Sequence, residues 1–430
     1  MEDKFDVIVV GAGPAGAAAA CRLAREGLQV ALVERGPYPG SKNLSGGVLF
    51  GQVLGRLIPE FWRQAPVERH ITRHVITFMT GETAFSSDFR TQAFDQPPYN
   101  GFSVLRGKFD RWLAEQAEQA GAMLVPGIKV DALVWEGTRV TGIRAGDEQF
   151  RANVVVAADG ANSFIAEQVG LRRKFDTAHL AVGVKELIGL PREVIADRFG
   201  LTGDEGAAFG LVGFATQGVA GGGFLYTNQE SLSVGLVMRL DGCLRAQVRP
   251  AEAMEGFLAH PAIAPFIRGG KLLEYGAHLV PEGGLAMMPK LAGDGILVVG
   301  DAAGLAVNNG FAVRGMDLAL GSGIAAAEAI LEAAAARDFS AAGLGGYTRR
   351  LESSFVMQDM RTYAGANDFL KNPRLYDAYP ALAADLMTRV YSQASEPKRH
   401  LLRMLLQTFP ESKLSPIDLL LDGWKGARRL

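Results

Sequence analysis

The first 34 residues constrain the fold more than any other segment of the chain. Residues 6–10 (DVIVV) are β-branched and almost wholly apolar, as expected for a parallel strand that is buried on both faces. Gly11, Gly13 and Gly16 follow at once in GAGPAG, and a helix is predicted over residues 15–26. The N-terminus of such a helix favours an anion, because its first N–H groups lack partners and its dipole is positive there. This order of parts predicts a dinucleotide-binding unit.

The three glycines have different physical tasks in such a unit. The first permits a tight turn, the second lets the backbone approach a pyrophosphate, and the third lets the helix pack closely on the strand. A second strand is predicted over residues 28–33, and Glu34 follows it, placed to accept hydrogen bonds from ribose hydroxyls. An acid at this position argues against a 2′-phosphate. A lone GxGxxG turn is a weak signal, but here the strand, the helix, the second strand and the acid all follow at the expected spacing. Together they favour a dinucleotide site over an ordinary glycine-rich turn.

Composition narrows the class of protein. The chain has 430 residues, 48% hydrophobic and 21% charged, with a net charge of −2, so nothing indicates nucleic acid as a partner. Its two cysteines, Cys21 and Cys243, provide no disulfide framework and fit a reducing cytoplasm. The acidic start runs straight into the first strand, so we expect no signal peptide. The longest apolar run, 324–336, contains two glutamates and predicts a buried helix, which leaves a cytoplasmic protein or one peripheral on the inner face of the cell membrane.

Three later segments decide which dinucleotide is bound. Arg106 begins a predicted helix, one buried strand ends at Asp159-Gly160, and another ends at Gly300-Asp301. A carboxylate at the carboxyl end of a parallel strand faces the ligand crevice, where ribityl hydroxyls can donate to it. No second glycine-rich turn lies in a strand–helix context, so we expect no separate NAD(P)H domain. The molecule that reduces the bound cofactor then docks from outside.

These segments resemble the glutathione-reductase-type FAD-binding fold over residues 5 to about 335. The resemblance implies FAD as the cofactor, with Asp301 on the ribityl chain and, after Asn309-Gly310, a helix whose N-terminus faces the isoalloxazine. We expect the following residues to contact FAD: Gly11, Gly13, Pro14, Ala15, Gly16, Glu34, Arg35, Gly47, Arg106, Val130, Asp159, Gly160, Gly300, Asp301, Asn309 and Gly310.

Residues 41–62, 222–237 and 309–323 narrow the resemblance to the FixC family, the quinone-reducing flavoproteins related to electron-transfer-flavoprotein:quinone oxidoreductase. It runs essentially end to end and implies electron flow from a two-subunit electron-transfer flavoprotein through FAD to a quinone. The larger relatives hold a 4Fe–4S cluster on four cysteines, but this chain has no cysteine after Cys243. The resemblance therefore implies a separate small ferredoxin-like 4Fe–4S subunit. It also implies an electron-bifurcating assembly that reduces ferredoxin or flavodoxin, with nitrogenase supply as one use.

The predicted fold class is α/β, with a glutathione-reductase-type Rossmann-like FAD domain, an inserted β-rich α+β quinone domain and a C-terminal helical segment. The predicted boundaries are 1–71, 101–175 and 281–337 for the FAD domain, 72–100 and 176–280 for the quinone domain, and 338–430 for the helical region. Because flavin chemistry resides mostly in the cofactor, we expect no catalytic residue beyond the flavin. The candidates for the quinone pocket are Phe224, Leu225 and Tyr226.

Two further patterns carry weaker signals. His70 and His74 are four residues apart, but their β-branched neighbours favour a strand, so we expect no metal site. Residues 397–409 place basic residues among leucines in helical spacing. Three interpretations of that helix stay open: it lies in a membrane interface, docks the ferredoxin-like partner, or packs on the domain.

Two other functions share the flavin motifs. One is a reductase of isoprenoid double bonds, similar to geranylgeranyl reductases. The other is a non-catalytic scaffold that carries a flavin. The fit of residues 41–62 and of the VRGMDLA segment to FixC favours the quinone oxidoreductase over both.

Overall fold

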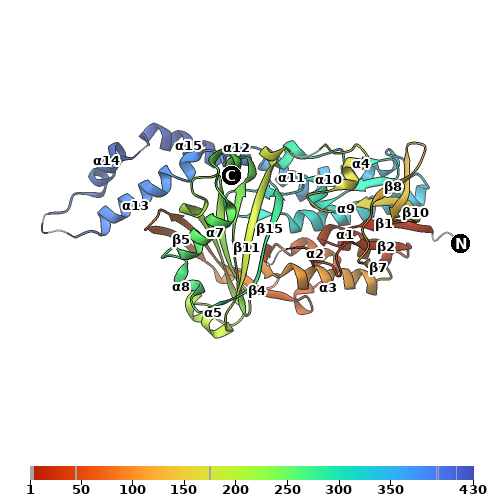
Figure 1. The fold of residues 1–430 in the computed structure, drawn as a ribbon, viewed down its shortest axis with the longest axis horizontal. Helices are drawn as coiled ribbons and strands as arrows, with labels where there is room; N and C mark the ends of the chain where they lie inside the picture. Colours follow the sequence, from red (N-terminus) through yellow and green to blue (C-terminus); the bar gives the residue numbers. More distant parts are fainter. Residues whose placement is uncertain (1–3, 44–45, 174–175, 394, 396, 413) are drawn as a thin grey trace.

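The computed structural model describes residues 4–43, 46–173, 176–393, 395, 397–412 and 414–430. The molecule is elongated (Figure 1). An α/β layer lies near the N-terminus, a large second sheet occupies the middle, and C-terminal helices project at the opposite end. This arrangement confirms the predicted fold class of an FAD-type α/β domain, a second β-rich part and a C-terminal helical segment.

The first sheet carries the dinucleotide motif at its centre. Its strands run parallel in the order β17-β10-β1-β2-β7, with β16 antiparallel at one edge and a β8–β9 hairpin extending from β10. The bounds are β1 Lys4–Val10, β2 Val30–Glu34, β7 Met123–Pro126, β8 Ala132–Glu136, β9 Arg139–Ala145, β10 Glu148–Ala157, β16 Ala292–Gly293 and β17 Ile296–Val298. Val7, Ile8 and Val9 are fully buried, because helices cover the sheet and the central strand has no wet face.

Three helices position the ligand-facing edge of this sheet: α1 (Pro14–Arg25), α3 (Arg106–Gln119) and α9 (Met316–Ala336). Helix α1 packs between α3 and α9. Within the described residues, α9 is the one helix long and apolar enough to span a membrane, but 61% of its most apolar window is buried inside the molecule. Its backbone approaches α1 so closely that a Cβ on Gly323 would lie 2.1 Å from the Ala15 carbonyl oxygen. We therefore assign α9 to the core.

The second sheet has nine strands, in the order β15-β11-β14-β13-β12-β4-β6-β3 with β5 paired to β4. Its pairs are antiparallel except for β4 with β12. The bounds are β3 Gly47–Leu49, β4 Val67–Met79, β5 Ala84–Arg90, β6 Phe102–Val104, β11 Leu180–Gly189, β12 Glu205–Gly213, β13 Gly221–Thr227, β14 Ser231–Arg239 and β15 Lys271–Pro281.

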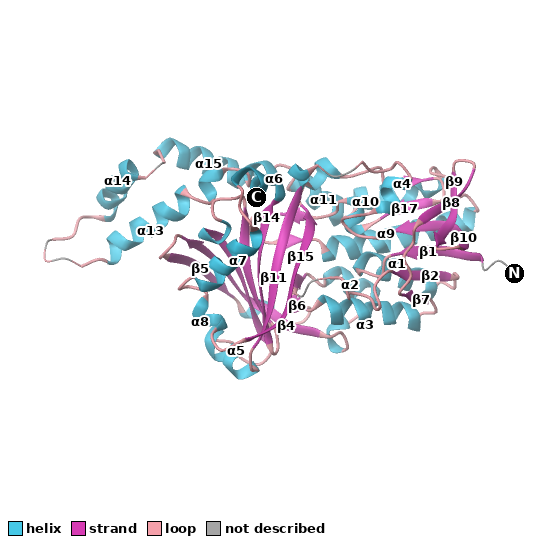
Figure 2. Cartoon of the chain, viewed as in Figure 1, coloured by secondary structure: helices cyan, strands magenta, loops and turns pink. Residues whose placement is uncertain are grey.

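One face of this second sheet is covered by short helices, as Figure 2 shows for α5 (Arg192–Phe199) and α7 (Pro250–Ala259). Ile195 and Phe257 from these helices pack with sheet residues such as Leu225 in a separate hydrophobic core. The opposite face of the sheet is therefore free to line a cavity toward the first sheet.

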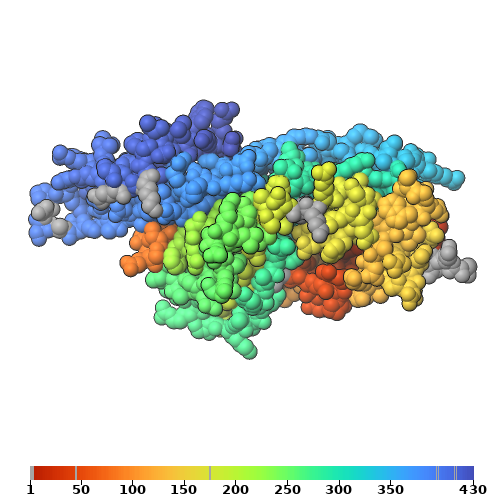
Figure 3. All heavy atoms as spheres, turned by 45° about the horizontal axis from the view of Figure 1, so that its top comes forward, coloured from red at the N-terminus to blue at the C-terminus, as the bar shows by residue number. Residues whose placement is uncertain are grey.

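The C-terminal region is held by an ion pair inside it. Its helices are α10 Gly346–Ser353, α11 Phe355–Thr362, α12 Ala366–Phe369, α13 Ala378–Tyr391, α14 Leu401–Glu411 and α15 Pro416–Arg429. Asp422 of α15 accepts two hydrogen bonds from Arg374, at 2.7 and 2.8 Å. These bonds, with one from Tyr379, hold the pKa of Asp422 at about 2. In Figure 3 this blue segment lies against the orange strand β5, and α13 contacts β4 and β5.

Several element boundaries differ from the predicted ones. The predicted boundary at residue 72 falls inside β4, and β3 and β6 pair in the second sheet although their residues were assigned to the FAD domain. The segment after Asn309 first forms a hairpin of β18 (Val307–Asn308) and β19 (Val313–Arg314), so helix α9 starts at Met316. Residues 397–400 precede α14 without regular secondary structure, so the basic residues there lie outside the helix.

The contact between α1 and α9 yields a test of the fold. Gly323→Ala places a methyl group against the Ala15 carbonyl, so we expect it to destabilise the protein by about 1–3 kcal/mol. Gly256→Ala, on α7, is the matched control, because nothing lies within 4 Å of its Cβ position and helix propensity then favours alanine by about 1 kcal/mol. Thermal unfolding of both variants checks this. A Gly323→Ala protein as stable as Gly256→Ala would show that α1 and α9 pack less closely.

Candidate functional site

A cavity of about 900 Å³ lies between the two sheets. The carboxyl ends of β1, β2 and β10 and the N-termini of α1 and α9 form one wall, and the free face of the second sheet forms the other. A ligand there contacts the crevice at the carboxyl edge of a parallel sheet, where α/β proteins bind dinucleotides.

The cavity brings together most of the residues predicted to contact FAD. Those that line it are Gly11, Gly13, Pro14, Ala15, Glu34, Arg35, Gly47, Arg106, Val130, Asp159, Gly160, Asp301 and Gly310. Gly16, Gly300 and Asn309 are not among its lining residues. Gly16 instead permits packing, because its Cβ would lie 1.9 Å from the Gly11 carbonyl oxygen. The Asn309 side chain accepts the N–H groups of the β18–β19 turn, at 3.1 and 2.8 Å.

The nucleotide end of the cavity is built around the N-terminus of α1. No side chain caps this helix, whose N-cap is Gly13, so its first amides are left for a ligand. A Cβ on Gly13 would extend into open space, with a single atom within 4 Å, the Arg106 Nη2 at 3.8 Å. Glu34 accepts the Ala12 N–H at 3.1 Å and the Gly36 N–H at 2.6 Å, so the acid also fixes the glycine turn.

Arg106 and two aspartates form the charged centre of the cavity. Arg106 donates to both oxygens of the buried Asp110, each at 2.8 Å, and Asn43 donates to the same carboxylate. Burial lowers the pKa of Arg106, but the neighbouring Asp110 and Asp301 raise it by more, so the net shift is upward. Burial and Asp110 raise the pKa of Asp301, while Arg106 opposes the shift. Asp301 is thus a partly buried acceptor that lines the cavity beside a fixed cation, which suits hydroxyl donors.

Asp159 has a structural role beside its place in the cavity wall. Its carboxylate accepts the Ser163 hydroxyl at 2.5 Å and the Ile165 N–H at 3.2 Å. Both residues lie at the start of helix α4 (Phe164–Gln168). Asp159 therefore shapes the turn that follows β10 in addition to lining the cavity.

The second sheet supplies an apolar, glycine-rich wall. Its lining residues include Ile76, Phe78, Gly183, Gly210, Gly222, Phe224, Tyr226 and Val237. Phe224 and Tyr226 stack, with ring centroids 5.0 Å apart. Leu225 points to the opposite face of β13, because successive strand residues alternate, and is fully buried in the core beneath the sheet. Of the three predicted pocket residues, the structure thus brings two to the cavity.

Sequence reasoning missed four ionisable groups on this wall: Lys185, Arg239, His278 and Glu282. Burial raises the pKa of Glu282, whereas the charge of Arg239 and a hydrogen bond from the Asn308 amide act to lower it. Lys185 could have been found from the sequence, because a lysine in the otherwise mainly apolar strand β11 is unusual. It lies on the same face of the strand as Gly183, which lines the cavity. Residues of the C-terminal region also line the cavity and were not predicted: Asn367, Phe369, Leu370, Leu375, Tyr376 and Leu430.

The histidines and cysteines have other surroundings. His70 and His74 lie on strand β4, and the His70 Nε2 is 2.6 Å from Asp95. Over the described part of the chain, no group of three or more His, Cys, Asp or Glu side chains could hold a metal ion. Cys21 and Cys243 are buried, and burial raises the pKa of both thiols.

Comparisons with known proteins agree with this geometry. Three family models match: an FAD-binding domain over residues 4–189, an ETF-QO ubiquinone-binding domain over 180–280, and the ETF-QO/FixC family C-terminal domain over 366–430. A probable electron transfer flavoprotein-quinone oxidoreductase of Escherichia coli (strain K12) is 49% identical over 429 residues, with 100% of each chain covered. Protein FixC of Salmonella typhi is 47% identical over 425 residues, with 99% of each covered. The chain belongs to the FixC family of ETF-QO relatives.

Solved structures show the same fold. A geranylgeranyl bacteriochlorophyll reductase-like protein from Thermoplasma acidophilum has a TM-score of 0.74 at 21% identity, covering 98% of this chain and 99% of that one. The myxobacterial chondrochloren halogenase CndH has a TM-score of 0.65 at 19% identity, covering 99% and 91%. These identities are too low to indicate a shared reaction, so the two neighbours support the fold alone.

This FixC-family protein is an FAD-dependent oxidoreductase. The cavity fits the cofactor: the open space at Gly13 suits a pyrophosphate, Glu34 suits a ribose, and the Asp301 carboxylate suits a ribityl chain. When bound, FAD takes up and releases the electrons, and the residues of the chain bind and orient it. The uncapped start of α9, at Gly315 and Met316, adds a positive helix end to the same cavity.

Gly13→Val tests the nucleotide site. The Gly13 φ of −77° is open to any residue, so the apoprotein should fold, while the new side chain fills the space for the pyrophosphate. We expect purified Gly13→Val protein to have a near-native melting temperature but no yellow FAD absorbance. Wild-type protein prepared in parallel gives the reference FAD content. A fully FAD-loaded variant would contradict the assignment of this end of the cavity.

Proposed function

We propose that the protein accepts electrons from a two-subunit electron-transfer flavoprotein and passes them through FAD to a membrane quinone. The observation that carries this proposal is the continuity of one cavity from the glycine turn of α1 to the apolar wall of the second sheet. The second sheet falls largely in the region that matches the ubiquinone-binding model. A ring bound on that wall would lie beside the flavin end of the cofactor.

The wall has the chemistry that a quinone ring requires. Its glycines leave room for a flat ring, and Phe224 with Tyr226 offers an aromatic surface for stacking. Ile76 and Phe78, on β4, extend the apolar surface. Ligand pockets of this kind are mostly apolar with few polar groups that set orientation.

Two protein partners are inferred from the small number of cysteines in the chain and from its family. A 4Fe–4S cluster takes about four thiolates, and the chain has two cysteines, Cys21 and Cys243, both buried. We therefore infer that a small ferredoxin-like subunit carries the cluster. In this proposal the electron-transfer flavoprotein delivers electron pairs, one electron going toward ferredoxin or flavodoxin and the other to the quinone.

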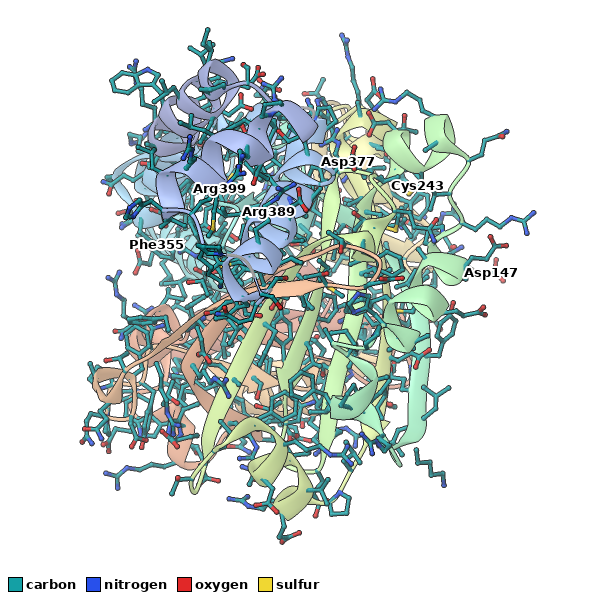
Figure 4. The ribbon with its side chains drawn as sticks, turned by 90° about the vertical axis from the view of Figure 1, so that its left-hand side faces the viewer. Asp147, Cys243, Phe355, Asp377, Arg389 and Arg399 are labelled. Atoms are coloured by element: carbon teal, nitrogen blue, oxygen red, sulfur yellow. The ribbon has the colours of Figure 1, made fainter. Side chains whose placement is uncertain are left out.

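An exposed apolar surface on α14 and α15 supports a peripheral contact with the inner face of the cell membrane. Large apolar side chains project from the molecule here: Leu401, Leu402, Leu406, Ile417, Leu420, Leu421 and Trp424 are each more than 50% exposed. Lys398, Arg399 and Arg403 are exposed beside them, and Figure 4 shows Arg399 among these helices. Phe409 and Leu414 pack inward against α13. One face of α14 is therefore packed on the molecule, and its other face is exposed. An amphipathic helix with basic residues is typical of an interfacial contact with anionic lipid.

The central prediction concerns redox behaviour. Purified protein should contain one FAD per chain and little iron, and its reduced flavin should be reoxidised rapidly by a soluble ubiquinone analogue. NADH alone should reduce it slowly, because the sequence offers no second glycine-rich turn between a strand and a helix, whereas an NADH-reduced electron-transfer flavoprotein should reduce it fast. Stopped-flow absorbance of the flavin measures both half-reactions.

Two outcomes would contradict this proposal. One is a reduced flavin that no quinone reoxidises. The other is turnover of a geranylgeranyl lipid by protein that a reduced ferredoxin supplies with electrons, which would favour the isoprenoid reductase. A bound FAD that cannot be reduced at all would instead indicate a scaffold.

Phe224 and Leu225 form a matched pair that tests the quinone wall. Phe224→Ala removes one ring of the stacked pair in the cavity, so we expect a roughly tenfold or greater rise in the KM for the quinone analogue. Leu225→Ala leaves the wall intact but opens the core beneath, which should cost about 2–5 kcal/mol of stability. Steady-state kinetics and thermal unfolding separate the two effects. An unchanged KM in Phe224→Ala would move the quinone away from this wall.

A further inference from the structure

Lys185 is a cation on the apolar wall of the cavity. It lies on β11, two residues after Gly183, and both residues line the cavity. Its Nζ donates to the Gly46 carbonyl at 3.2 Å and lies 5.5 Å from the centroid of the Phe224 ring. The ammonium group thus sits where the loop before β3 meets the aromatic surface proposed for the quinone.

Burial, with the charge of Arg106, makes the proton of Lys185 labile. Burial and the Arg106 charge lower its pKa to about 8, while Glu274 on β15 opposes the shift. The nearby phenol of Tyr226 is no competing acid, because burial raises its pKa to about 12. At neutral pH Lys185 is therefore mostly protonated and yet a far better proton donor than an ordinary lysine.

His278 connects the same place to solvent. On β15 it pairs with Gly183, while Gly276 pairs with Lys185, so both side chains project from the same face of the sheet. The ring is exposed and also lines the cavity. Burial of part of the ring, together with Lys185 and Arg106, lowers its pKa, so it is mainly neutral at pH 7 and can accept and pass on a proton.

We propose that Lys185 donates a proton to the quinone oxygen that is reduced in this cavity, and that His278 returns a proton from solvent to Lys185. This proposal rests on the proposed quinone reduction. Conversion of a quinone to the quinol takes two electrons and two protons. Bound FAD in its reduced form would supply both electrons and one proton. The second proton leaves Nζ, a new O–H bond forms on the quinone, and Lys185 remains as a neutral amine until it is protonated again.

A purely structural role for Lys185 makes a different prediction. The bond to Gly46 could serve only to hold the loop before β3 on the second sheet. Lys185→Arg distinguishes the two roles, because a guanidinium keeps the charge and can donate to the same carbonyl but does not release its proton. If holding the loop is the whole role, arginine rescues all functions. If proton donation is the role, arginine rescues FAD binding and not quinone reduction.

The experiment uses FAD-loaded full-length protein that has been reduced and is then mixed rapidly with a soluble ubiquinone analogue between pH 6 and 10. The wild-type rate constant should be level below the Lys185 pKa and fall about tenfold per pH unit above it, because the proton is lost as pH rises. Lys185→Arg and Lys185→Met should be about 100-fold slower or more and lack this break, since general acids contribute roughly 10²–10⁴-fold. His278→Phe should react at the wild-type rate in this single turnover, but turn over more slowly in a steady-state assay with reduced electron-transfer flavoprotein in excess.

A second readout does not depend on turnover. The midpoint potential of the bound FAD should change its pH slope near the Lys185 pKa in the wild type, and that change should vanish in Lys185→Met. Retention of the slope change in Lys185→Met would overturn the placement of Lys185 at the redox centre. Lys185→Arg with wild-type rate and pH break would overturn proton donation alone. A wild-type protein whose flavin no quinone reoxidises would overturn the proposed function itself, and the donation with it.

Discussion

The fold depends on backbone contacts that only glycine allows around the first turn of α1. A Cβ on Gly11 would lie 2.3 Å from the Ala158 carbonyl oxygen, and one on Gly323 would lie 2.1 Å from that of Ala15. These contacts lock α1 between β1, β10 and α9, so the uncapped N-termini of both helices open into the same cavity. A larger residue at either position would separate the two positive helix ends, and with them the two ends of the cofactor site.

The second sheet can both pack on helices and line the cavity because alternate residues of each strand point to opposite faces. One face packs on helices such as α7 and is mainly apolar, while the other carries glycines, aromatic rings and a few ionisable groups into the cavity. Phe224 and Leu225 are neighbours in sequence, yet one lies on the ligand face and the other in the core. The apolar surroundings that would bind a quinone also desolvate Lys185 and lower its pKa to about 8. In the proposed mechanism, quinone binding and proton donation both arise from this wall.

The sequence was informative where function depends on local order. The first 34 residues predicted a strand, turn, helix and acid that the structure reproduces within a few residues, and Asp301 lies in the cavity as expected. Lys185 and His278 could not be predicted together, because pairing of β11 with β15 brings them to one face across a long stretch of sequence. The short strands β3 and β6 could not be assigned to the second sheet from the sequence for a similar reason. Their three residues carry little periodicity, and their place is set by pairing with each other and with β4.

The C-terminal region links the outer surface to the cavity. Leu430, at the end of α15, lines the cavity and lies against Gly310, where an added Cβ would be 3.1 Å from its side chain. Gly426 of the same helix packs on Phe369, another lining residue, and Asp422 ties the helix to Arg374. The opposite face of α15 exposes Leu420 and Trp424. A membrane or a partner protein that binds this face is therefore one helix away from the redox cavity. Because an ion pair and a close glycine contact fix α15 to residues that line the cavity or lie beside it, a contact on its outer face would bear directly on the cavity wall.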